Sequence, residues 1–578
     1  TGTQLFESCQ IVVLIPATFS QDQFSANIDH QISSANRLSG KLFFTNQPSM
    51  DPLSSSRAVS RFERNRDTRQ RTLSLTNTHI LSPTMANEFR AGFFRNRNDT
   101  RPVAYFTNEQ FGMHNPLAHL RPDLVSMDVR GERDVGDRFA FGTYANDIRD
   151  VQNSFTYADT LSFSRRQHSV KVGGEFRRHQ LNGDLRELKN GRKNFRDWFA
   201  FLTVGFVNPG DGNRARQISD TALNYGHNVR GYRMSDYSFF VADDWKVSPR
   251  LTLNVGMRWE YFGFPSEVNG ILSVFDYHAA LATGNAQDGF IMASNFKPET
   301  IPGAAQSNLK KANTPSIISA DRNNFMPRFG FAWAPLGGTK VVVRGGYGVF
   351  FERTTGAFAN SLRQSSPFFR EAQINDQSSY HTWAEDYPVF PIPQFIVGFS
   401  SAGVPSLRRA DVPGTTFEAY ESQMVDPNLA TPYTQQWSLN LQWGFRPSWL
   451  WEFGYAGTKG TKLLSIYNIN RAIDVDTVGF MPRPGPVPGG GLIGNYYGPS
   501  SGGVFVNLKT PPPTCNLLVN PKGTCVVDPE VRSPLLGFDE DEGVNYLSSN
   551  ANSIYNSFQT SLQKRFSQGY MFKVNYTF

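Results

Sequence analysis

The sequence predicts an all-β fold, a transmembrane antiparallel β-barrel, and three observations lead to this class. Residues 251–261 alternate between apolar and polar side chains with a period of two, which gives a strand one apolar and one polar face. The apolar face lacks charge over about ten residues, the length of a tilted strand that crosses a bilayer. The same pair of strands, joined by a very short turn, recurs along the chain.

The composition fits this class. Mean hydropathy is −0.40 and the apolar fraction is 39%, because a barrel with a wet lumen is polar at half of its strand positions. Aromatic residues reach 13%, with 48 Phe and 21 Tyr, as expected of aromatic girdles at two membrane interfaces. Composition alone leaves open an aromatic-rich soluble β-sandwich.

Other classes find little support in the sequence. The longest aliphatic run near the start, residues 11–15, ends at Pro16 and is far shorter than the about 20 residues of a transmembrane helix. No signal peptide is visible after Thr1, so for an exported protein we expect the true N-terminus to lie upstream. The net charge of +7 is spread along the chain and predicts no nucleic-acid partner.

Seven hairpin units account for the predicted strands. Pro, Gly, Ser and Asn dominate their turns, as tight connections require. The units span residues 23–45, 71–95, 154–181, 239–262, 325–352, 431–457 and 553–578, and their turns lie near 33–37, 82–84, 166–167, 248–250, 335–339, 446–448 and 567–569.

Long segments rich in Pro, Gly, Asn and charge separate the hairpins. They cover residues 46–70, 99–153, 183–236, 264–324, 353–430 and 463–552. Structureless loops of this length are unusual in a compact soluble domain. Their strict alternation with short turns is typical of an outer-membrane barrel, with short periplasmic turns and long extracellular loops.

The cost of charge in lipid predicts which way the strands face. Arg or Lys facing lipid near the midplane costs about 2–4 kcal/mol. Arg344 alternates with apolar residues of its strand, so we expect it to face the lumen. Lys171, Glu175 and Arg177 alternate in the same way with Val170, Val172 and Phe176. Such charges indicate a wet or plugged interior.

The direction of the first and last strands predicts that the chain is a fragment. The strand from Gln23 runs inward to a short turn, and the strand Tyr570–Phe578 runs outward from one. Both directions are opposite to those of a complete barrel, although a terminal Phe resembles the assembly signal of such proteins. We therefore expect fourteen strands of a larger barrel, about 22 as in plugged transporters, with residues 1–578 all belonging to the barrel domain.

Several motifs resemble a known family in their sequence and order. They are SPTMANEFRAGFFR (82–95), FFVADDWKVSPRLTLNVGMRWEYF (239–262), NNFMPRFGFAWAP (323–335), VVRGGYGVFFER (342–353), TPYTQQWSLNLQWGF (431–445), GYAGTKGTKL (454–463) and SIYNSFQTSLQKRF (553–566). Together they resemble the Oar-like TonB-dependent receptors, frequent in acidobacteria and related Gram-negative groups. The resemblance implies a carboxypeptidase-regulatory-like domain, a plug and a large outer-membrane barrel. No segment matches the plug or its TonB-contacting box.

A cluster of arginines between the first two hairpins is a candidate anion site. Residues 57–71 are expected to form a loop and carry six Arg. Guanidinium groups bind phosphate and carboxylate well, so Arg61, Arg64 and Arg66 are candidates for contact with lipopolysaccharide phosphates or an anionic ligand. The favoured alternative is a solvated loop or lumen wall.

The cysteines predict at most one disulfide. Cys515 and Cys525 lie in one segment and could close a small loop in an oxidising compartment, with two free thiols as the alternative. Cys9 would then have no partner. No motif predicts a catalytic, cofactor-binding or metal site.

The function expected from this fold and resemblance is energy-coupled, TonB-dependent uptake by an outer-membrane receptor. Extracellular loops would capture a ligand too large or too scarce for porins, and a plug would block the lumen until TonB pulls it. The expected partners are outer-membrane lipid and lipopolysaccharide, the TonB complex through the plug, and an unidentified extracellular ligand. A passive channel and a surface adhesion or structural barrel are the alternatives, and none of the three is an enzyme.

Overall fold

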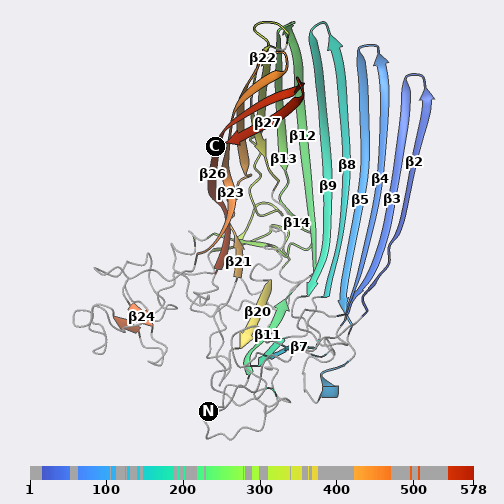
Figure 1. Ribbon diagram of the computed structural model, residues 1–578. Helices are drawn as coiled ribbons and strands as arrows, with labels where there is room; N and C mark the ends of the chain where they lie inside the picture. Colours follow the sequence, from blue (N-terminus) through green and yellow to red (C-terminus); the bar gives the residue numbers. More distant parts are fainter. Residues whose placement is uncertain are drawn as a thin grey trace, which may run out of the picture.

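In the described part of the chain, fourteen long strands follow one another in a single curved, antiparallel sheet (Figure 1). Their short turns lie at one end of the sheet, and the described short strands of the long connections lie at the other. This computed structural model describes residues 16–52, 63–103, 106–111, 124, 126–129, 139–142, 147–186, 192–195, 201, 218–226, 229–276, 279, 289–297, 310–338, 340–353, 362, 368–374, 422–469, 495–497, 505–507 and 544–578.

All seven predicted hairpins are present, and each strand pairs antiparallel with the next along the chain. The strands are β2 (Asp22–Ser33), β3 (Asn36–Asp51), β4 (Arg64–Ser82), β5 (Met85–Pro102), β8 (Asp147–Arg165), β9 (His168–Arg186), β12 (Val229–Ser248), β13 (Leu251–Phe262), β18 (Asn324–Trp333), β19 (Val341–Phe351), β22 (Tyr433–Arg446), β23 (Trp449–Asn468), β26 (Val544–Ser567) and β27 (Tyr570–Thr577).

The short turns fall where the sequence predicts them. Six of them leave two residues between the paired strands, and the β18–β19 connection is longer. In the last hairpin, Gln568 and Gly569 both have positive φ, 55° and 85°. Two successive residues with positive φ form the turn whose twist matches that of a hairpin.

Several strands are longer than predicted, and this corrects the loop boundaries. Residues 46–51 and 64–70 were expected in a loop, yet they pair with each other in β3 and β4. The strands β8, β9, β12, β23 and β26 likewise extend into segments predicted as loops. Backbone pairing continues past the apolar stretch into residues that are polar on both faces, where hydropathy no longer alternates.

The sheet has one apolar face and one polar face. One apolar row crosses six strands at Leu75, Ala91, Tyr157, Phe176, Tyr237 and Tyr261, each opposite the next. Large side chains elsewhere on the same apolar face are also exposed, as at Phe239 and Val255, with 60% and 51% of their surface accessible. Gly457 leaves room for the Trp437 indole, because a Cβ there would overlap the ring.

The predicted charges lie on the polar face. Glu175 lies opposite Ser238, and Arg177 lies opposite Asp236. Arg344 lies opposite Asn440, and its guanidinium is 3.5 Å from Gln442 Oε1.

The long connections contain folded structure of their own, contrary to the expectation of structureless loops. Five short strands from three connections form one sheet: β6 (Ser126–Val129), β7 (Phe139–Phe141), β10 (Arg192–Phe195), β11 (Ile218–Gly226) and β20 (Phe369–Ile374). A second sheet contains β15 (Ser273–Phe275), β16 (Phe290–Met292) and β17 (Lys310–Lys311). Shorter elements are β1 (Thr18–Phe19), β14 (Ser266–Glu267), β21 (Ser422–Val425), β24 (Asn495–Tyr497), β25 (Phe505–Asn507) and the 3-10 turn η1 (Glu109–Phe111).

The two ends of the long sheet remain separate within the described residues. There β2 pairs with β3, and β27 pairs with β26, but β2 and β27 do not pair with each other. Every residue of β27 is exposed. The described sheet therefore presents two open edges.

Candidate functional site

A buried hydrophobic cluster joins the long connections to the barrel wall at the long-loop end. Two separate parts of the wall contribute: Tyr232 of β12 with Leu181 of β9, and Leu547 of β26 with Leu464 of β23. The connections contribute Leu272, Val274, Ala293, Ile317, Ile318, Leu362, Val425 and Leu429. The strands β13, β18, β19 and β22 separate the two parts along the sheet, so the cluster, which we call the loop platform, connects parts of the wall that are not neighbours in the sheet.

A buried carboxylate fixes the start of the loop platform. Glu267 is 1% exposed, and its Oε1 accepts the Gly231 N–H at 3.0 Å. Its Oε2 accepts the N–H groups of Asn269 at 2.7 Å and Ile271 at 3.0 Å. These bonds hold the segment after β14 against β12.

We predict that Glu267→Gln loosens this segment selectively. An amide NH₂ in place of one oxygen cannot accept a backbone N–H, and an unsatisfied buried donor costs about 1–3 kcal/mol. Hydrogen exchange in detergent should show faster exchange at residues 231, 269 and 271. Glu88→Gln, which alters an exposed ion pair with Arg90, is the control, and equal protection in the two variants would contradict the assigned role.

Between the loop platform and the short turns, an ionic cluster on the polar face joins strands that are distant in the chain. Asp236 of β12 accepts Nε of Arg353 at 2.8 Å and Nη2 at 3.1 Å. It also accepts the Gly263 N–H at 3.2 Å, and Nε2 of His179 lies 3.3 Å away. Arg353 follows the end of β19, so the cluster connects the β9–β12 wall to β19. The Asp236 carboxylate is almost inaccessible, with 10% of the side chain exposed.

Further charges lie on the polar face nearer to the short turns. Arg258 bonds Glu260 and Ser238, and its guanidinium lies 5.7 Å from the Phe240 ring centroid. Arg328 lies 4.7 Å from the centroid of Phe350. These charged groups make the polar face ionic and suit it to contact with water or a polar ligand.

The structure places only part of the predicted anion site. Arg64 and Arg66 lie in strand β4, so the prediction of a loop is wrong for these residues. Arg64 donates to Asp51 from Nε and Nη2 at 3.2 and 2.8 Å, and Nη2 of Arg66 is 4.0 Å from the same carboxylate. Arg61, Cys515 and Cys525 lie outside the described residues, so their roles remain predictions.

Sequence reasoning missed the residues that organise the long-loop end. Asp236 and Arg353 are separated by 117 residues, and no motif links them. Glu267 lies in a segment expected to be a loop. A signal was present at Asp236, whose position continues the polar row of β12 past the apolar stretch.

Two other kinds of site were sought in the described part of the chain. No group of three or more His, Cys, Asp or Glu side chains there is arranged to hold a metal ion. No helix there is long and apolar enough to cross a membrane.

The long hairpins, opposite faces and folded long connections define a β-barrel of the membrane-spanning type. The family model described as "Outer membrane beta barrel domain" matches residues 5–578, and the chain belongs to this family. The apolar face therefore faces lipid and the polar face lines the lumen, with short periplasmic turns and long extracellular loops. The protein is located in the outer membrane of a Gram-negative bacterium.

Comparison with solved structures gives distant similarities. The outer membrane transporter YddB from Escherichia coli is 10% identical with a TM-score of 0.45, over 95% of this chain and 45% of that one. The siderophore receptor PirA from Acinetobacter baumannii is 9% identical with a TM-score of 0.39, over 95% and 51%. The ferric enterobactin receptor PfeA from Pseudomonas aeruginosa, as a mutant, is 8% identical with a TM-score of 0.42, over 97% and 51%.

The chain spans about half the length of these structures. No curated protein matches the sequence.

Proposed function

We propose that this chain is the wall of an energy-coupled outer-membrane receptor that takes up a large or scarce ligand. The loop platform is the observation that carries this proposal. Its buried cluster holds two long connections against separate parts of the wall, which offers a pre-organised surface for capture. Pre-organisation lowers the entropy lost when a ligand binds.

The width of the barrel supports transport rather than a packed core. Barrels of about eight strands have interiors that side chains fill or that hold one small ligand. This wall has fourteen long strands and a lumen face rich in paired charges. A lumen of this size has room for a solute or for a plug.

Further strands complete the barrel in this proposal. Unpaired backbone groups of an open edge cost several kcal/mol each in lipid. The edges β2 and β27 are of this kind in the described structure, so residues 1–578 would form one part of a larger barrel domain. A wall of about 22 strands would match the plugged transporters.

Gating without covalent chemistry is the proposed mechanism. A plug belonging to the same protein would close the lumen, and TonB would pull it when the loops hold ligand. The motif resemblance to Oar-like TonB-dependent receptors supports this coupling. The lumen charges would then provide exchangeable polar contacts for both the plug and the solute.

Uptake by living cells tests the proposal. The medium of three strains is compared by mass spectrometry: the parent, a deletion of this gene and a deletion of tonB. We expect the same compound to remain in the medium of both deletion strains. If the compound remains in the medium of the gene deletion but not of the tonB deletion, the protein is a passive channel. If both deletion strains remove every compound as the parent does, the protein is an adhesion or structural barrel.

A further inference from the structure

Six arginines form a belt on the lipid-facing side of the wall, at its extracellular end. They share the alternation of the apolar row, so their side chains leave the sheet on the same side as Leu73 and Phe93. The belt comprises Arg69 and Arg71 of β4, Arg95, Arg97 and Arg101 of β5, and Arg149 of β8. By contrast, Arg64 and Arg66 belong to the opposite alternation of β4.

The register fixes the height of the arginine belt. Leu73 lies opposite Phe93, which lies opposite Phe155 and packs against its ring at 5.1 Å. The next lipid-facing pair is Arg71 and Arg95, followed by Arg69 and Arg97. Since a strand rises about 3.3 Å per residue, these pairs lie roughly 7 and 13 Å beyond the last apolar row along the strand. Positions at this distance beyond the hydrocarbon core correspond to the headgroup level of the outer leaflet.

The belt carries more positive charge than its carboxylates neutralise. Asp99 is 6% exposed and forms ion pairs with three arginines of the belt: Arg97 at 2.9 Å, Arg101 at 2.9 Å and Arg149 at 3.3 Å. Asp67 pairs with Arg69 at 2.7 Å. Among the described side chains, two carboxylates, Asp67 and Asp99, therefore pair with four of the six guanidinium groups of the belt.

The strand register also places like charges beside each other, and at Arg71 and Arg95 no carboxylate partner is described. Arg71 lies directly opposite Arg95, and Arg69 directly opposite Arg97. Like charges in such positions destabilise a sheet, so an anion between them would relieve a cost that the protein alone bears. Arg95 donates to Asn153 Oδ1 at 2.9 Å, and Arg71 lies 5.9 Å from the Phe44 ring centroid. Neither of these contacts supplies negative charge.

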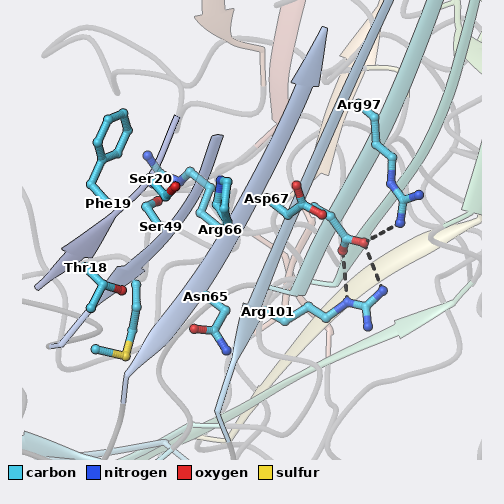
Figure 2. Close-up of a pocket in the computed structure, with 12 residues that line it drawn as sticks. Thr18, Phe19, Ser20, Ser49, Asn65, Arg66, Asp67, Arg97 and Arg101 are labelled. Atoms are coloured by element: carbon cyan, nitrogen blue, oxygen red, sulfur yellow. Dashed lines mark hydrogen bonds and ion pairs between the residues drawn. The ribbon is translucent and has the colours of Figure 1, made fainter. Parts of the chain in front are cut away.

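A pocket adjoins the belt at the edge farthest from the short turns. It has a volume of about 590 Å³, and Arg97, Arg101 and Asp67 lie on one side of it (Figure 2). Asp99 and Arg66 also line it. Phe19, Pro48 and Met50 add apolar surface. Guanidinium groups beside apolar side chains suit a phosphorylated headgroup that is attached to acyl chains.

We propose that the arginine belt binds the phosphate groups of lipopolysaccharide, at its lipid A headgroup. The belt faces away from the lumen, so a soluble anion captured for uptake would not reach it from the extracellular mouth. Its height and charge match the phosphates of the outer leaflet, and arginine forms bidentate bonds with phosphate. This inference rests on the outer-membrane location and does not depend on the proposed uptake.

Binding of lipid A to the full-length protein in detergent tests the belt. The probes are bisphosphorylated lipid A, enzymatically dephosphorylated lipid A and inorganic phosphate, and bound lipid is counted by native mass spectrometry. We expect bisphosphorylated lipid A to bind about tenfold or more tightly than the dephosphorylated form, because two or more charge-assisted bonds are lost. Inorganic phosphate should not displace it at equal concentration.

The variant Arg71→Gln/Arg95→Gln should lose this preference about tenfold while leaving the Asp99 ion pairs in place. Arg328→Gln/Arg344→Gln, which changes two lumen arginines, is the matched control and should bind like the parent. Heat-modifiable migration on gels reports folding, and the single variant Arg95→Gln serves if the double variant does not fold. Equal binding of both lipids, displacement by inorganic phosphate, or equal loss in both double variants would overturn the proposal.

Discussion

Leu272→Ala should open the loop platform while the barrel wall stays folded. Leu272 is fully buried in the cluster that joins the connections to β9, β12, β23 and β26. Removing a buried leucine side chain costs about 2–5 kcal/mol, because both transfer energy and cavity energy are lost. This is a large share of the stability of a unit held by one small cluster, so the extracellular connections should separate from the wall.

Limited proteolysis of intact cells measures this opening. Mass spectrometry should find faster cleavage in the extracellular connections of the variant, whereas heat-modifiable migration should remain that of a folded barrel. Leu439→Ala is the control, because Leu439 faces lipid with 53% of its surface exposed and its loss leaves no protein cavity. If both variants are cut at the same rate, the cluster does not hold the loops.

The membrane-spanning part of the fold follows directly from the sequence. In β13 the alternation from Leu251 to Tyr261 coincides with the observed strand Leu251–Phe262. One face meets lipid and the other a wet lumen, so each position has a single acceptable polarity. Short turns rich in Gly, Ser and Pro then fix the hairpins, and the sidedness of Arg344 and Glu175 follows from the same rule.

The extracellular part does not follow in this way, for a physical reason. Beyond the hydrocarbon core both faces of β4 carry polar or charged side chains, so residues 64–71 contain no hydropathy alternation although they form a strand. The ion pair of Asp236 with Arg353 depends on strands that are far apart in the chain. The parallel pairing of β6 with β10 involves strands of four residues each from different connections, too short for a periodic signal.

The predicted arginine site illustrates the same limit. Composition identifies a basic segment at 57–71, but only the register separates Arg64 and Arg66 from Arg69 and Arg71. One pair of these residues lies on the lumen alternation beside Asp51, and the other lies on the lipid alternation beside the β5 arginines. A shift of one position in a strand changes which solvent a side chain meets.

Arg353→Met should weaken the contact between β19 and the β9–β12 wall. Asp236 would keep His179 and the Gly263 N–H but lose two charge-assisted bonds. Breaking a buried ion pair by removing one partner costs about 3–5 kcal/mol, because the other charge is left uncompensated. Water in the lumen should bring the effect to the lower end of this range, since 28% of the Arg353 side chain is exposed.

A double variant separates loss of the ion pair from loss of packing. Asp236→Asn/Arg353→Met removes the isolated charge while retaining an oxygen that can accept the Gly263 N–H. Hydrogen exchange at residues 229–236 and 263–276 should therefore be slower in the double variant than in Arg353→Met. The single variant Asp236→Asn completes the comparison. If the effects of the two single substitutions on exchange add up to that of the double variant, Asp236 and Arg353 stabilise the wall independently, because interacting residues give non-additive energies. Non-additivity would instead assign the contact between these distant strands to the ion pair itself.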